Sequence, residues 1–85
     1  MCMTFVTIDN DSVRLRELSN MIFQVWPGSI IYEFTDPMLA IKYICNNQVN
    51  KVVANRKMRP VDGEQIKSMI YMHKPEVMVE LIEKT

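Results

Sequence analysis

The chain has 85 residues, enough for one small domain, which is predicted to span residues 1–85. Hydrophobic residues make up 48% of it, too many for a disordered protein, yet no apolar run approaches the roughly 20 residues of a membrane span. Ten basic residues balance ten acidic ones, so charge gives no argument for binding nucleic acid or an anionic membrane.

The first half of the chain predicts two strands and two helices. Residues 3–8 are a β-branched and aromatic run typical of a strand, and the polar residues that follow start a helix at Asp11 or Ser12. Pro27-Gly28 ends this helix, and residues 29–34 predict the second strand. The next helix begins at Asp36-Pro37 and ends near residues 46–47. The buried stripe expected on the first helix consists of Leu15, Leu18, Ile22 and Val25, with Met21 and Trp26 beside it, and that on the second of Leu39, Ala40, Tyr43 and Ile44.

The second half predicts one clear strand, a loop, a helix and an ambiguous final segment. Residues 51–54 lack alternation, as expected for a strand covered on both faces, and the loop of residues 55–63 leads to a helix that ends near residues 73–75. Residues 76–85 fit a strand through Val77-Met78-Val79, but their i,i+4 apolar pairs also fit a helix. The repeated βα order favours the strand, and with it an α/β fold with a parallel sheet, right-handed crossovers and helices on both faces.

Three segments together resemble a receiver domain of two-component response regulators. Residues 5–12 resemble its first strand and acidic turn, and residues 34–41 its second strand and helix. Residues 52–63 resemble its third strand and phosphoacceptor loop, usually Asp-x-x-Met-Pro-x-x-Asp-Gly: Met58, Asp62 and Gly63 keep their offsets, while Pro60 lies one place late. The resemblance implies a three-layer, flavodoxin-like sandwich with strand order 2-1-3-4. It also implies a chain that stops before the family's fifth strand, which carries a lysine, and its fifth helix.

The resemblance also marks where this sequence departs from the family. Asn55 stands at the phosphoacceptor position, and Asp9 matches the first of two metal-binding acids while Asn10 stands at the second. By spacing from Pro75, Glu80 falls where the family has a serine or threonine at the end of its fourth strand. The loop residues Arg56 and Lys57 are candidates for the missing pocket cation, with a solvated loop as the simpler interpretation.

These departures predict a pseudo-receiver, a non-enzymatic and non-phosphorylatable regulatory module in the cytoplasm of a bacterial two-component system. An amide is not a practical nucleophile, and with Asp9 as the one carboxylate left, no cofactor is expected and magnesium only weakly if at all. Two alternatives stay open: phosphoryl transfer through another acid, Asp62 or Glu80, or a receiver fragment without a function of its own. The uncovered fourth strand predicts a protein partner or a homodimer through its edge, an exchanged segment, or a final helix packed across the sheet. Cys2 and Cys45 are expected to be free thiols, although one bridge stays open.

Overall fold

The computed structural model describes residues 2–83, which form an alternating series of strands and helices. The elements are β1 (Thr4–Ile8), α1 (Ser12–Val25), β2 (Ile30–Phe34), α2 (Pro37–Asn46), β3 (Lys51–Asn55), α3 (Gly63–His73) and β4 (Met78–Ile82). Each predicted element is present, and the ambiguous final segment is a strand; residues 84–85 of that prediction lie outside the described residues. No helix in residues 2–83 is long and apolar enough to cross a membrane.

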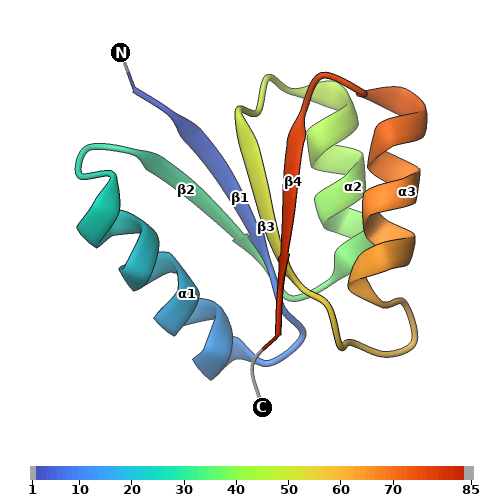
Figure 1. Ribbon diagram of the computed structural model, residues 1–85, viewed down its shortest axis with the longest axis horizontal. Coiled ribbons are helices and arrows are strands. Elements are labelled where there is room, and N and C mark those ends of the chain that lie inside the picture. The colour runs from blue at the N-terminus through green and yellow to red at the C-terminus, as the bar shows by residue number, and fades with distance from the viewer. Residues whose placement is uncertain (1, 84–85) are drawn as a thin grey trace.

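The strands form one parallel sheet in the order β2-β1-β3-β4, with α1 on one face and α2 and α3 on the other (Figure 1). The predicted α/β class, three layers and strand order are therefore confirmed. Because β1 and β3 are neighbouring central strands, their carboxyl ends lie side by side at the carboxyl end of the sheet. Within residues 2–83, β2 and β4 are the edge strands.

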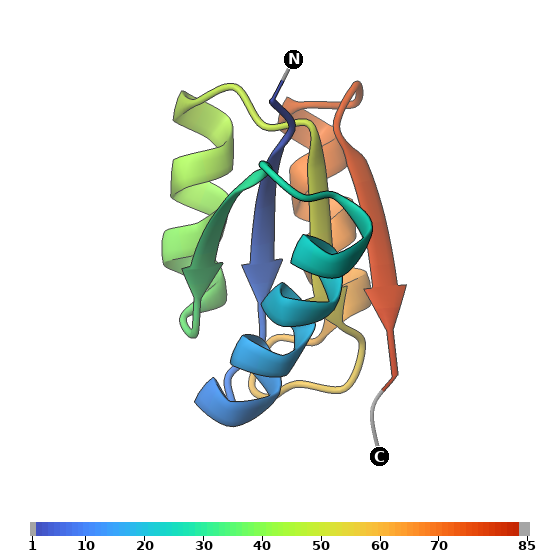
Figure 2. The ribbon, with the colours of Figure 1, turned by 90° about the vertical axis from the view of Figure 1, so that its left-hand side faces the viewer.

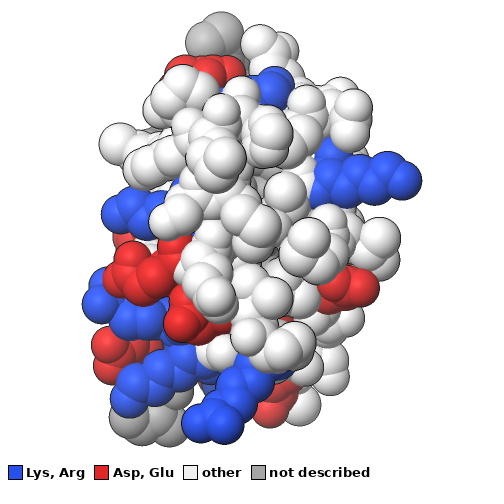
Figure 3. Space-filling model, turned by 90° about the vertical axis from the view of Figure 1, so that its right-hand side faces the viewer, with Lys and Arg blue, Asp and Glu red and all other residues white. Residues whose placement is uncertain are grey.

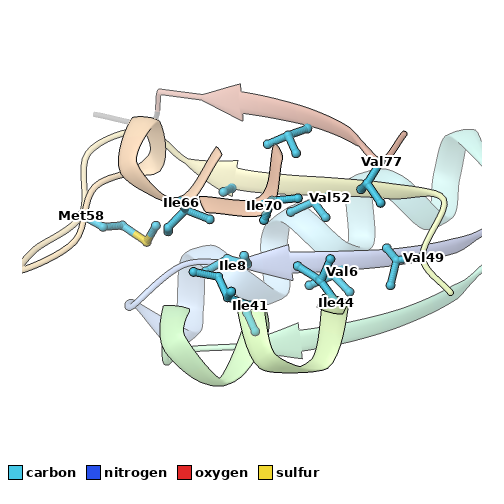
Figure 4. Close-up of a cluster of buried hydrophobic side chains, with 13 residues drawn as sticks. Val6, Ile8, Ile41, Ile44, Val49, Val52, Met58, Ile66, Ile70 and Val77 are labelled. Atoms are coloured by element: carbon cyan, nitrogen blue, oxygen red, sulfur yellow. The ribbon is translucent and has the colours of Figure 1, made fainter. Parts of the chain in front are cut away.

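Two hydrophobic clusters hold the layers together. The larger one lies between the sheet and the pair α2 and α3 (Figure 4), and it includes Val6, Ile44, Val52, Ile66 and Ile70, all fully buried. The smaller one packs Leu18 and Ile22 of α1 against Phe5 and Val53. Since β1 and β3 contribute to both clusters, these strands are buried on both faces, which explains why residues 51–54 show no alternation.

Each helix begins at an aspartate that caps it. Asp11 accepts hydrogen bonds from two backbone amides in the first turn of α1. Asp36 accepts one from the amide of Met38 in α2, which has Pro37 in its first turn. Asp62 forms a reciprocal capping box with Gln65 at the start of α3. These caps fix where the loops at the carboxyl end of the sheet turn into helices.

The predicted apolar stripes are only partly buried. Leu15, Leu18 and Ile22 are buried on α1, but Val25 is 71% exposed and Met21 and Trp26 are about half exposed. Figure 2 shows the reason: α1 crosses the middle of the sheet, and β4 beside it is not covered on this face. On α2, Ile41 is buried and Leu39 is exposed, the reverse of the prediction.

Candidate functional site

Polar side chains meet at the carboxyl ends of β1 and β3. Asp9 directly follows β1, and Asn55 is the last residue of β3. Asp9 is 2% exposed and Asn55 is 1% exposed, although both are polar. The carboxyl edge of a parallel sheet is where open α/β folds place their functional groups. Because buried polar groups require hydrogen-bond partners, the partners of these two residues define what the site can do.

The carboxylate of Asp9 accepts four hydrogen bonds. Its Oδ1 accepts from the backbone amide of Asp11 at 2.9 Å and from Nη2 of Arg14 at 3.2 Å. Its Oδ2 accepts from Nε of Arg14 at 3.2 Å and from Nδ2 of Asn55 at 3.1 Å. A carboxylate offers about four lone-pair sites, so the acceptor capacity of Asp9 is filled. We call these three side chains the Asp9–Arg14–Asn55 cluster.

Arg14 is the cation of this cluster. It lies in the first turn of α1, where the Asp11 cap accepts from its backbone amide at 3.2 Å, and its side chain is 34% exposed. Hydrogen bonding to Asp9 raises the pKa of the Arg14 guanidinium. The pKa of Asp11 is lowered, first by the backbone hydrogen bond from Arg14 and next by that from Val13. Two guanidinium nitrogens of Arg14 thus donate to the two oxygens of Asp9 in a bidentate contact.

Arg56 and Lys57, the two candidates for the pocket cation, lie near acids outside the cluster. Arg56 lies 3.5 Å from Glu64 and 3.8 Å from Glu83, and Lys57 lies 3.7 Å from Glu83. Their side chains are 46% and 69% exposed. The backbone amide of Arg56 donates to the carbonyl of Ile82 at 2.7 Å, which continues the β3–β4 pairing beyond Asn55. The first loop residue after β3 therefore stays paired with β4.

Both ends of the Asn55 amide are engaged. Its Nδ2 donates to Asp9, and its Oδ1 accepts from the backbone amide of Lys57 at 3.1 Å. The acceptor and donor partners fix the orientation of the amide, because its NH2 group must face the carboxylate. Asparagine thus fits a position that brings it next to a buried anion, where an aspartate would add a second negative charge.

Asn10 and Glu80 do not join the cluster. Asn10 is exposed, and its Nδ2 donates to the carbonyl of Arg59 at 3.0 Å, which ties the turn after β1 to the loop after β3. Glu80 stands opposite Val53 in the register and pairs with Lys51 at 2.9 Å, so its predicted place in the pocket is wrong. Ile82 is the residue opposite Asn55. The turn before β4 places the end of the strand two residues later than the spacing from Pro75 suggested.

The loop of residues 55–63 is shaped by packing and backbone contacts. Met58 is buried in the larger core cluster, and Asp62 caps α3. The amide of Gly63 donates to the carbonyl of Arg56 at 2.9 Å. A Cβ on Gly63 would lie 2.8 Å from the Arg56 Cα and 2.8 Å from the Asn55 carbonyl oxygen, so only glycine fits without movement.

An open cavity of about 830 Å³ lies above the cluster. It is lined by Asn10, Arg56, Lys57, Met58, Arg59, Asp62 and Glu64. Neither Asp9 nor Asn55 lines it, because both are buried below the loop. A ligand in this cavity would contact the basic and acidic side chains of its lining before it reached the cluster.

The cluster does not fit the magnesium ion that the receiver resemblance implies. Magnesium takes several oxygen ligands in octahedral geometry, including charged carboxylates. Here Asp9 is the one carboxylate in the cluster, and both its oxygens already accept hydrogen bonds, two of them from a guanidinium. Within residues 2–83, no group of three or more histidine, cysteine, aspartate or glutamate residues is placed to hold a metal.

Comparison with solved structures identifies a receiver fold. The chain superposes on the signal receiver domain of an HD domain-containing protein from Pseudomonas fluorescens with a TM-score of 0.85 and 15% identity, covering 100% of this chain and 66% of that structure. For a response regulator receiver domain protein from Clostridium thermocellum, the TM-score is 0.80 at 17% identity, covering 93% and 63%. An uncharacterised protein from Neptuniibacter caesariensis gives 0.79 at 23% identity, covering 88% and 54%.

These likenesses establish the fold. The chain spans between about half and two thirds of the length of these structures. No protein-family model matches the sequence, and a search of curated proteins found no match.

The sequence prediction missed Arg14. Arg14 follows Asp9 by five residues across a helix cap, so the first helical turn brings its side chain back over the carboxylate. A basic residue in the first turn of a helix that starts directly after an acid-bearing strand was the available signal.

Proposed function

We propose that this chain is a pseudo-receiver, a non-enzymatic signalling module of two-component type that acts by binding and accepts no phosphoryl group. The observation that carries the proposal is the Asp9–Arg14–Asn55 cluster. Asn55, which stands at the phosphoacceptor position by the sequence resemblance, carries an amide that is hydrogen-bonded at both ends. The receiver fold of the solved structures supports the two-component context.

The chemistry of the cluster argues against phosphorylation at Asn55. The lone pair of an amide nitrogen is delocalised into the carbonyl, so it is a poor nucleophile for the phosphorus of a phosphoryl donor. Phosphoryl transfer also requires cations that neutralise the charge of the transferred group. In the cluster, the positive charge of Arg14 is already neutralised by Asp9 at 3.2 Å. The Asp9–Arg14–Asn55 cluster itself therefore has neither a nucleophile nor an available cation.

The two other acids considered as phosphoacceptors are placed poorly for this role. Asp62 accepts from the backbone amide of Gln65 at 2.9 Å and caps α3, so its carboxylate has a structural partner. Glu80 pairs with Lys51 on the α1 side of the sheet, two register positions before Asn55. Both positions favour the pseudo-receiver over phosphoryl transfer through another acid.

The surface favours a protein as the binding partner. Figure 3 shows a broad uncharged area over the middle of the face formed by α2 and α3, with basic and acidic side chains interspersed at its margins. Among the described residues on this face, neither sign forms the continuous patch that nucleic acid or an anionic membrane would require. We propose a cytoplasmic module that binds a protein or a second copy of itself, the latter through the edge of β4.

Intact-mass spectrometry after incubation with acetyl phosphate and magnesium tests the proposal. A receiver domain with an aspartate at the phosphoacceptor position serves as the positive control for the reagents. The expected result is an unchanged mass for this chain under conditions in which the control gains one phosphoryl group. A stable gain by this chain overturns the proposal, and its loss in Asp62→Asn or Glu80→Gln would identify the acid responsible.

A further inference from the structure

The outer edge of β4 presents unpaired backbone groups in the part of the chain that the structure describes. The carbonyl of Ile82 accepts from the amide of Arg56 at 2.7 Å, so the backbone groups of Ile82 point toward β3. Backbone direction alternates along a strand, and the amides and carbonyls of Val79 and Leu81 therefore point away from the sheet. Such an edge is a template for pairing with another strand.

The side chains along this edge are mostly apolar. On the α3 side, Val77 and Val79 belong to the larger core cluster and Leu81 packs against it. On the α1 side, Met78 is 65% exposed, and a groove of about 190 Å³ separates β4 from α1. Ile82 lies in the lining of this groove. An extended partner would thus meet both backbone groups and apolar side chains.

The charges at the edge favour a second copy of this chain as the partner. Lys51 and Glu80 are the charged residues that line the groove, and they pair with each other at 2.9 Å. One positive and one negative charge give no net attraction to an acidic or basic partner. They are self-complementary, however, because a two-fold axis presents the same pair in reversed order.

We infer that β4 pairs with β4 of a second copy of this chain, antiparallel and centred on Val79. This inference rests on the binding role proposed above and specifies its surface. A two-fold axis makes the two paired strands antiparallel, and it passes beside one residue, which then faces its own copy. Because the outward backbone groups belong to Val79 and Leu81, this central residue can be Val79, Glu80 or Leu81. Centring on Glu80 places two carboxylates directly opposite each other, which is destabilising. Centring on Leu81 places Val79 opposite the charged Glu83.

The Val79 centre avoids both conflicts. It places Val77 opposite Leu81 of the second copy on the α3 side of the joined sheet. On the α1 side it places Met78 opposite Glu80 of the second copy. Lys51 stands next to Met78 in the register, so it lies on the same row as that carboxylate. Charges of opposite sign are then distributed evenly across the joint.

Sedimentation velocity of the whole chain from micromolar to millimolar concentration tests the pairing, with matched substitutions at Met78. Because Met78 is 65% exposed, both Met78→Lys and Met78→Glu are compatible with the fold. In the dimer each residue 78 faces Glu80 of the second copy, so the lysine adds two opposite-charge cross-strand pairs and the glutamate adds two like-charge pairs. At a few tenths of a kcal/mol per pair, the dissociation constant is expected to fall about threefold for Met78→Lys and to rise about threefold for Met78→Glu.

The same two changes at Met38, which is 54% exposed on α2, provide the control and are expected to leave the constant unchanged. A chain that remains monomeric at every concentration leaves the edge to another partner and overturns the inference. Dimers that respond equally to lysine and glutamate at Met78, or that respond at Met38, overturn the β4 register. Phosphoryl uptake is measured separately, so failure of the pairing and failure of the pseudo-receiver proposal are distinguishable.

Discussion

Replacing Asn55 by aspartate exchanges one NH2 group for one oxygen at the centre of the cluster. The Asn55 Nδ2 now donates to the Asp9 Oδ2 at 3.1 Å, so the substitution turns a hydrogen bond into a contact between two carboxylates. The remaining contact, from the Lys57 amide to Oδ1, is preserved. The change therefore isolates the effect of charge at the position where receivers carry their phosphoacceptor.

The structure sets the size of the effect. Two unit charges about 4 Å apart interact by about 4 kcal/mol at an effective dielectric near 20, and loss of the hydrogen bond adds about 1 kcal/mol. Arg14 attracts both carboxylates, and proton uptake by the new carboxylate limits the repulsion. We expect Asn55→Asp to lower the free energy of unfolding by roughly 2–4 kcal/mol at neutral pH without magnesium. For a domain of this size the Tm falls by roughly 10–30 °C.

The loss depends on pH. Repulsion from Asp9 raises the pKa of the introduced carboxylate in the folded state above its unfolded value. Below the unfolded pKa the group is protonated in both states, so repulsion costs nothing. The stability difference from the natural chain therefore grows as pH rises through the unfolded pKa, and it is complete above the folded pKa.

Thermal unfolding followed by circular dichroism in EDTA, at acidic and neutral pH, measures the effect. The double variant Asp9→Asn with Asn55→Asp is the matched control, because it keeps one carboxylate and one amide and only exchanges their places. It is expected to recover at least half of the lost stability. An Asn55→Asp variant whose Tm at neutral pH equals or exceeds that of the natural chain would refute the reasoning.

Four further outcomes are expected. Arg14→Met leaves the buried Asp9 carboxylate without its cation and should lower the stability in urea far more than Arg16→Met does, because the side chain of Arg16 is 71% exposed. Equal losses would contradict a special role for Arg14. Millimolar magnesium should leave the Tm of the natural chain unchanged relative to EDTA, and a clear rise would show that the cluster accepts the ion. Gly63→Ala should cost about 1–3 kcal/mol in urea unfolding because of its 2.8 Å backbone contacts, and a neutral result would mean that the loop yields easily. Ile66→Ala should lower the free energy of unfolding in urea by about 2–5 kcal/mol because Ile66 is fully buried. A clearly smaller loss would mean that the core cluster is loosely packed around this residue.

The fold was predictable because its signals are local. Capping aspartates, Pro27-Gly28 and short β-branched runs lie next to the boundaries that they set, and the βα order leaves few topologies. The extent of burial was less predictable. Helical spacing placed Val25 on the buried stripe, but whether a stripe is covered depends on what packs beside the helix, which no residue of α1 encodes.

The site was predictable at Asn55 and Asp9 and not at its cation. Strand ends in a parallel sheet meet at one edge, so the two residues could be placed together from topology. The choice among Arg14, Arg56 and Lys57 depends on the direction in which each backbone segment leaves the edge. The β3–β4 pairing carries Arg56 away from the cluster, and the first turn of α1 returns Arg14 to it. The prediction placed Glu80 at the end of the fourth strand, but the turn before β4 puts Ile82 there, opposite Asn55.

The positions at which this loop agrees with the receiver pattern are those that the fold requires. Met58 fills the core, Asp62 caps α3, and Gly63 passes within 2.8 Å of the neighbouring backbone. None of these contacts involves a phosphoryl group. Asn55, by contrast, departs from the pattern at a position whose side chain would have to react. The same loop thus retains the residues that support its shape and has an amide where the pattern has the reacting carboxylate, which is the combination that the proposed pseudo-receiver function predicts.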